Sequence, residues 1–95
     1  MDTKHLRTFV TVAREGSLTR AAQRLHLTQP ALSLQIKALQ ESLGLTLFSR
    51  TPHGLELSDD GRAALPAAER VLDALDEGLR HAGALGQALR GRLRI

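Results

Sequence analysis

The stretch from Gln29 to Lys37 contains residue types that suggest chemistry, and that chemistry is recognition of another molecule. Glutamine can hydrogen-bond both polar atoms of an adenine edge, serine can bond a base edge or a phosphate, and proline or leucine can touch a thymine methyl group. Lysine supplies a positive charge for a phosphate. For any one such residue, a solvated helix face is the simpler explanation. The residues concerned are Gln29, Pro30, Ser33, Leu34 and Lys37.

Catalysis and metal binding find little support in the sequence. It has no nucleophile with a base and an orienting group at usable spacing, no glycine-rich phosphate loop and no carboxylate pair in a predicted cleft. Ser33 and His53 are the only catalytic candidates, and a place in a binding surface explains them better. We expect neither enzymatic activity nor a metal ion or cofactor on this chain. The four histidines are too scattered for a zinc site: His5, His26, His53 and His81.

The sequence also argues against a membrane or secreted location. It contains no apolar run long enough for a membrane span and no basic-then-apolar opening of a signal peptide. The absence of cysteine fits a reducing compartment. We therefore expect a cytoplasmic protein with no membrane partner.

The full chain of 95 residues has the length of a single domain. Positive charge is concentrated in its first part. Residues 1–58 contain seven Lys or Arg against four Asp or Glu, which is net +3, whereas residues 59–95 contain six Arg and six acidic residues. An excess of three charges also arises by chance. A basic unit followed by a neutral segment is expected of a phosphate-binding unit with a separate assembly element.

Three helices are predicted to position the polar stretch. Residues 4–15 have apolar residues at helical spacing, and Gly16 follows them. Ser17 can cap a short helix over residues 18–25, where adjacent alanines permit a close helix crossing.

The third helix carries the polar stretch on its outward face. Thr28 can cap this helix, Pro30 is tolerated in its first turn, and Gly44 ends it. A short helix, a three-residue turn and a longer helix together form a helix-turn-helix. The inward face comprises Leu32, Ile36, Leu39 and Leu43.

A hairpin and a long helix are predicted to follow. Apolar residues alternate with polar ones on both sides of the Pro52 and Gly54 loop, which indicates a two-stranded wing over residues 45–57. Ser58 is a good helix cap, and two acidic residues after it favour the helix dipole. The fold class is therefore mainly α, a winged helix-turn-helix of three helices and a hairpin, followed by a long linker helix.

The last helix has a heptad seam that a second surface must cover. We expect the seam to mediate dimerisation, because a helix of this length overhangs so small a core. The alternative is that it folds back on its own domain. The seam residues are Leu65, Ala68, Leu72, Leu75, Leu79 and Ala82.

The sequence divides into three segments on these patterns. Residues 1–58 form the winged helix-turn-helix and residues 59–88 the linker helix. Residues 91–95 alternate like the beginning of a strand, so residues 89–95 are predicted to start a hinge or the first strand of a further domain.

The whole pattern resembles the LysR-type transcriptional regulators, over essentially the full chain and without gaps. A dozen separated positions agree together, which makes the resemblance specific. The matching segments are Leu6-Arg7-Thr8-Phe9-Val10, Gly16-Ser17-Leu18-Thr19-Arg20-Ala21-Ala22, Leu25-His26, Thr28-Gln29-Pro30-Ala31-Leu32-Ser33, Gln35-Ile36, Leu39, Leu43-Gly44, Leu47-Phe48, Arg50-Thr51, Leu57-Ser58 and Gly61.

The resemblance implies a transcription regulator that binds double-stranded DNA at an interrupted inverted repeat. It implies a homodimer whose linker helices pair antiparallel, possible tetramers of the full-length protein, and a small-molecule effector bound only by a further, C-terminal domain. Lys37 and Arg24 are also expected to contact phosphates, but this expectation comes from their residue types and not from the resemblance. The expected DNA-binding residues are Ser17, Arg20, Thr28, Gln29, Pro30, Ala31, Ser33, Leu34, Lys37, Arg50, Thr51 and His53.

Two positions depart from the family pattern, and both lack a permanent positive charge. Leu34 and His53 each stand where the family often has arginine. Arginine can grip guanine or enter a narrow minor groove, so we expect no guanine reading at Leu34 and weaker wing contacts.

A winged-helix module that binds protein partners is the competing interpretation. Leu34 and Pro30 suit either surface, whereas the positive charge and the polar face favour DNA. Salt separates the two, because phosphate contacts weaken steeply with ionic strength and apolar protein contacts do not.

Overall fold

Three short helices form the helix-turn-helix part of the computed structural model, which describes residues 1–93, with side chains as far as residue 89. Helix α1 spans Thr3–Glu15, α2 spans Leu18–Leu25 and α3 spans Gln29–Leu43. The predicted caps are confirmed, because the Ser17 hydroxyl accepts from the Arg20 N–H and the Thr28 hydroxyl from the Ala31 N–H. Gly16 and Gly44 end α1 and α3 in the left-handed conformation, which glycine adopts without strain.

The core lies where α1 crosses α2 and α3. Phe9, Leu32 and Leu39 are fully buried there, and Ala21 at the α2 crossing has no exposed surface. A partly buried polar contact joins α1 to α3, in which the Thr8 hydroxyl donates to Gln35 Oε1 at 2.5 Å. Apolar burial and this hydrogen bond together hold α3 against α1.

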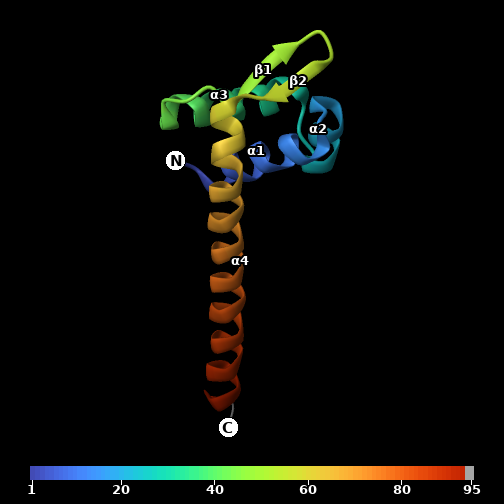
Figure 1. Cartoon of the computed structure of the whole chain (residues 1–95). Helices are drawn as coiled ribbons and strands as arrows, with labels where there is room; N and C mark the ends of the chain where they lie inside the picture. Colours follow the sequence, from blue (N-terminus) through green and yellow to red (C-terminus); the bar gives the residue numbers. More distant parts are fainter. Residues whose placement is uncertain (94–95) are drawn as a thin grey trace.

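A two-stranded antiparallel sheet forms the predicted wing. Strand β1 spans Phe48–Thr51 and β2 spans Gly54–Leu57, with Phe48 paired to Leu57. The wing is fastened at its base, because the rings of Phe48 and Phe9 pack edge to face with centroids 5.6 Å apart. The hairpin projects from this base beyond the helices (Figure 1).

Helix α4 spans Asp59–Leu93 and projects far beyond the other elements (Figure 1). The molecule with this helix measures 64 × 25 × 20 Å. The predicted strand is wrong over residues 91–93, because these residues continue the helix. Arginine and leucine are good helix formers, and a three-residue strand without a pairing partner is not stable. Residues 94–95 of that prediction lie outside the described residues. None of the described helices combines the length and apolar character needed to cross a membrane.

The structure divides the predicted heptad seam of α4 into two halves. Ala68 and Leu72 are each only 6% exposed and belong to the core of their own domain, with Leu65 packed against it. In this half the helix therefore packs against its own domain, which was the alternative to dimerisation. Leu75 is half-buried and Leu79 is 60% exposed, and the remaining seam residue, Ala82, is also exposed. Heptad spacing identifies an apolar face but does not identify the surface that covers it.

Two ion pairs fasten α4 to α1. Arg7 Nη2 lies 2.5 Å from Asp76 Oδ1, and Arg14 Nη2 lies 2.8 Å from Glu69 Oε2. The hydrogen bond from Arg7 holds the pKa of Asp76 below its ordinary value. The folded chain therefore favours the ionised carboxylate at this position.

The first turn of α4 lies very close to Leu47, the residue that precedes β1. A Cβ placed on Gly61 would overlap the main-chain oxygen of Leu47, far inside van der Waals contact. That oxygen also accepts the hydrogen bond from the Ser58 N–H at 2.9 Å. A side chain at position 61 would have to displace backbone.

We expect Gly61→Ala to lower the free energy of unfolding by about 1–3 kcal/mol, because the new methyl group forces the backbone apart. Gly78→Ala is the matched control, since nothing lies within 4 Å of a Cβ at this helical position. There the change should raise the free energy of unfolding by up to about 1 kcal/mol. Urea denaturation of the three proteins measures both effects. Stabilisation by both substitutions would contradict the close approach at Gly61.

We expect Asp76→Asn to lower the Tm slightly at pH 7, because the variant loses the ion pair with Arg7. A carboxylate with a lowered pKa stabilises the fold above its ordinary pKa and loses this contribution as the pH falls through the lowered value. The Tm values of the two proteins should therefore converge in strong acid. Asp73→Asn is the control, since Asp73 has no ion pair among the described residues. A difference in Tm that does not change with pH would argue against this role of Asp76.

Candidate nucleic-acid interface

The outward face of α3 is exposed as predicted, which leaves it available to a partner. Its predicted contact residues Gln29, Pro30, Ser33 and Lys37 are exposed, and Leu34 has 67% of its surface exposed. Ala31 is half-buried in the first turn. A large apolar side chain with this exposure at the middle of a polar helix face is suited to an apolar contact with a partner.

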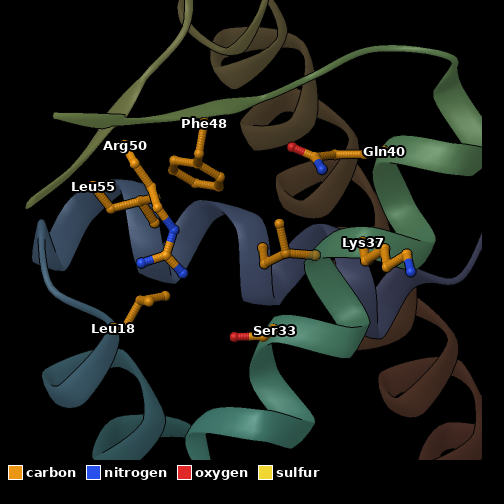
Figure 2. Close-up of a pocket in the computed structure, with 8 residues that line it drawn as sticks. Leu18, Ser33, Lys37, Gln40, Phe48, Arg50 and Leu55 are labelled. Atoms are coloured by element: carbon orange, nitrogen blue, oxygen red, sulfur yellow. The ribbon is translucent and has the colours of Figure 1, made fainter.

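A shallow hollow lies between α3 and the wing. Its floor contains the apolar side chains of Leu18, Ile36 and Leu55, and Ser33 and Lys37 come from α3. Figure 2 shows Arg50 reaching from β1 into this hollow, with its guanidinium turned toward Leu18 and Ser33. The remaining lining residues are Gln40 and Phe48. The hollow thus brings three of the predicted contact residues, Ser33, Lys37 and Arg50, to one place.

A second hollow extends from the first residues of α2 and α3 to the tip of the wing. The predicted contact residues Ser17, Gln29, Arg50, Thr51 and His53 all line it, and Arg50 also belongs to the first hollow. Free N–H groups and positive dipole ends at helix N-termini favour anions. The arrangement can therefore hold a negatively charged group between α2, α3 and the wing.

Lys37 and Arg50 provide the charge of this surface. Neither takes part in an ion pair among the described residues. Both can therefore pair with an external phosphate without breaking an internal contact.

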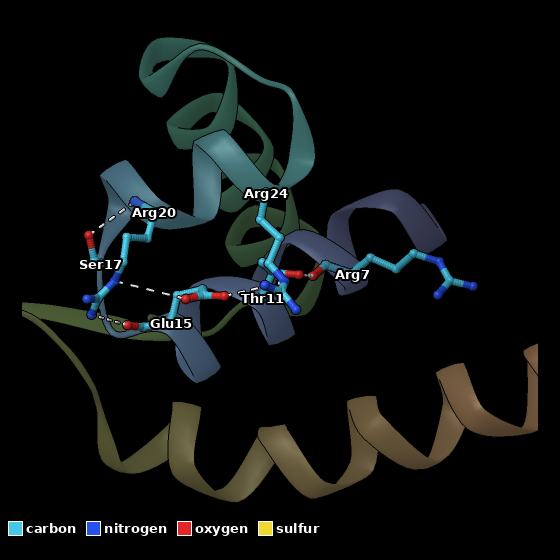
Figure 3. Close-up of polar contacts among 6 residues, drawn as sticks. All are labelled: Arg7, Thr11, Glu15, Ser17, Arg20 and Arg24. Atoms are coloured by element: carbon cyan, nitrogen blue, oxygen red, sulfur yellow. Dashed lines mark hydrogen bonds and ion pairs between the residues drawn. The ribbon is translucent and has the colours of Figure 1, made fainter.

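Arg20 and Arg24 behave differently, because both are turned toward Glu15 at the end of α1 (Figure 3). Arg20 Nη2 donates to the main-chain oxygen of Glu15 at 2.9 Å, and its Nε lies 4.0 Å from the Glu15 carboxylate. Arg24 Nε lies 3.4 Å from the same carboxylate. A phosphate contact of either arginine would therefore compete with Glu15. The sequence showed these positive charges but not the tertiary contact with Glu15.

Thr19 is a member of this surface that the sequence reasoning did not select. Its hydroxyl accepts a hydrogen bond from Gln29 Nε2 at 3.0 Å, and it lines the second hollow beside Gln29. The two residues are ten apart and begin different helices, so no periodicity within one helix indicates their contact. Thr28 acts as the cap of α3.

The described residues contain no group of three or more histidine, cysteine or acidic side chains that could hold a metal ion.

Three helices with a hairpin wing, the third helix presenting an exposed polar face beside a hollow, define a winged helix-turn-helix protein. A protein-family model described as the bacterial regulatory helix-turn-helix protein of the lysR family matches residues 3–62. The chain belongs to the LysR family. The resemblance and the fold class expected from the sequence are both confirmed.

Several transcriptional regulators are similar to this chain over most or all of its length. An uncharacterized HTH-type transcriptional regulator in the ibpB-leuC intergenic region of Azotobacter vinelandii is 42% identical over 95 residues. The HTH-type transcriptional regulator BudR of Klebsiella aerogenes is 43% identical over 95 residues. The chain covers 66% of each of these two relatives and 30% of the uncharacterized regulator YfeR of Shigella flexneri, to which it is 41% identical over 92 residues.

Solved structures agree with this assignment. The crystal structure of CbnR, a LysR family transcriptional regulator, has a TM-score of 0.85 at 36% identity, covering 88% of this chain and 29% of CbnR. A crystal structure of the BenM DBD in complex with catB site 1 DNA also has a TM-score of 0.85, at 34% identity. That similarity covers 90% of this chain and 97% of the BenM domain.

Proposed function

We propose that this chain is the operator-binding part of a LysR-type transcriptional regulator and binds double-stranded DNA in a sequence-specific manner. The observation that carries the proposal is the exposed face of α3 beside a hollow lined by two cations, Lys37 and Arg50, which make no ion pair among the residues that the structure describes. The similarity to a BenM domain whose structure is a DNA complex supports it. The proposal assigns no catalytic activity to the chain.

In this proposal α3 enters the major groove with its first turns. Gln29 and Ser33 offer hydrogen bonds to base edges, and Leu34 offers an apolar surface to a thymine methyl group. Pro30 and Ala31 shape the approach of the first turn. The uncharged face at position 34 favours A·T-containing sites over sites that need a guanine contact there.

In this proposal, phosphate contacts fix the position of α3 along the DNA. Lys37 and Arg50 lie on the two sides of the first hollow, and the start of α2 at Ser17 opens into the second. The wing residues Thr51 and His53 line the same second hollow, which suits contacts with the backbone beside the groove. Because Arg20 and Arg24 are engaged by Glu15, they are secondary contacts in this scheme.

We further propose a homodimer that reads an interrupted inverted repeat. The free half of the α4 seam, with Leu75, Leu79 and Ala82, is the surface for the second copy, while the half near the domain is already covered. A two-fold axis through paired helices presents two copies of α3 to two half-sites. We also propose that the full-length regulator forms tetramers, acts in the cytoplasm and binds a small-molecule effector through another domain. DNA binding by this chain needs no cofactor in this proposal.

Selection from random DNA duplexes at two salt concentrations tests the proposal. We expect an inverted repeat to be enriched and the affinity to fall steeply with salt, because bound phosphates release counterions. If no sequence is enriched and salt has no effect, the chain is instead an interaction module for proteins.

We expect Lys37→Ala to weaken binding to all duplexes alike and to reduce the slope of log affinity against log salt by about one. Arg80→Ala, which removes an exposed arginine from the projecting part of α4, should leave both the affinity and the slope unchanged. Fluorescence anisotropy titrations over a range of salt concentrations give both quantities. Equal effects of the two substitutions would show that Lys37 has no phosphate contact.

We expect Leu79→Asp to raise the Kd of the dimer at least tenfold, because it places a charge in the proposed apolar seam. Leu34→Asp is the matched control, since it makes the same change at a similarly exposed leucine on α3 and should leave the association unchanged. Sedimentation equilibrium of the two variants and the unchanged chain measures the Kd. An unchanged chain that stays monomeric at every concentration would refute the proposed interface.

A further inference from the structure

We propose that Thr19 is a positioning residue that fixes the side-chain amide of Gln29, so that α3 prefers adenine to guanine at one base pair of each half-site. The inference rests on the proposed DNA-binding function and adds to it the residue that decides one base. Thr19 is the second residue of α2, and Gln29 is the first residue of α3.

The contact lies on the surface that is offered to DNA. Gln29 Nε2 donates to Thr19 Oγ1 at 3.0 Å, and both side chains are exposed. Both also line the second hollow, together with Arg50 of the wing. Among the described residues, Thr19 is the one side-chain partner of the Gln29 amide. DNA entering the hollow therefore meets an amide that is already hydrogen-bonded to a neighbouring helix through its nitrogen.

The direction of the amide determines which polar atoms face the groove. A glutamine side chain has two N–H donors on its nitrogen and one acceptor, its oxygen. With one N–H bonded to Thr19, the other N–H and Oε1 of Gln29 remain for a partner. Adenine presents one acceptor, N7, and one donor, its N6 amino group, in the major groove. One donor and one acceptor on the protein match this pattern.

The opposite direction of the amide would match a different base. With Oε1 accepting from the Thr19 hydroxyl, Gln29 would present its N–H groups outward and withdraw its acceptor. Guanine presents two acceptors in the major groove, N7 and O6. The last torsion of a glutamine side chain is broad and roughly two-fold, so an amide without a neighbour at position 19 can take both directions. In the bond observed here the Thr19 hydroxyl accepts from Gln29 Nε2, which leaves one N–H and Oε1 of Gln29 for a partner, the pattern that suits adenine.

Thr19→Val is the decisive variant, because it keeps the branched shape of threonine and replaces only the hydroxyl with a methyl group. The best duplex is first found by selection with the unchanged chain, and Gln29→Ala identifies the base pair that depends on Gln29. Affinities are then measured for duplexes with adenine or guanine at that position. We expect Thr19→Val to reduce the adenine-over-guanine preference by roughly five- to tenfold. Thr19→Ser, which keeps a hydroxyl, should retain the original preference.

Two further readouts separate positioning from a general structural effect. Affinity for non-specific duplex, and its salt dependence, should be unchanged in Thr19→Val, because Lys37 and Arg50 are untouched. In a chain that already carries Gln29→Ala, adding Thr19→Val should have no further effect on base preference. Thr19→Ala provides a second variant without a hydroxyl, and thermal melts verify that each variant is folded.

An unchanged preference in both Thr19→Val and Thr19→Ala would overturn the role of Thr19 and leave the proposed function intact. A uniform loss of affinity for all duplexes would also overturn it, since that result indicates a structural role. If the unchanged chain enriches no sequence, both the proposed function and this inference fail.

Discussion

The buried face of α1 is the constraint on which the other elements depend. This one helix packs against α2, α3 and α4, and Phe9 on its inner face also meets Phe48 at the base of the wing. Because α2, α3, α4 and the base of the wing at Phe48 all contact α1, their mutual angles depend on this one helix. The polar bond between Thr8 and Gln35 adds direction to packing that is otherwise apolar and therefore weakly directional. The positions of the exposed face of α3 and of the wing therefore both depend on the packing around α1.

Local signals in the sequence were sufficient to predict the helices of the amino-terminal domain. Ser17 and Thr28 cap the helices that follow them, and Gly16 and Gly44 end the helices before them, because capping depends on atoms only a few residues apart. Ser58 also caps its helix, by accepting from the Gly61 N–H. The hairpin followed from the alternation around its turn, and its pairing confirms that pattern.

Features that depend on tertiary contacts could not be predicted in this way. The seam of α4 is apolar along its length, yet only packing shows that Leu72 belongs to the core and Leu79 does not. The charges of Arg20 and Arg24 were visible, but the position of Glu15 between them required the crossing of α1 and α2. The bond between Thr19 and Gln29 likewise joins the starts of two helices whose separation is a property of the fold. Alternation over five residues was too short a pattern to distinguish a strand from the end of α4.

The way α4 leaves the domain makes it a lever arm. It starts at Asp59, directly after the Ser58 cap and the end of β2, so no flexible loop separates its base from the wing. From Leu72, its last residue in the core, to Leu93 the helix rises about 30 Å at 1.5 Å per residue. A tilt of about 10° at the base would therefore move the far end by roughly 5 Å, the length of one helical turn. Mechanical coupling between the wing and a point far from it is thus a direct consequence of an uninterrupted junction.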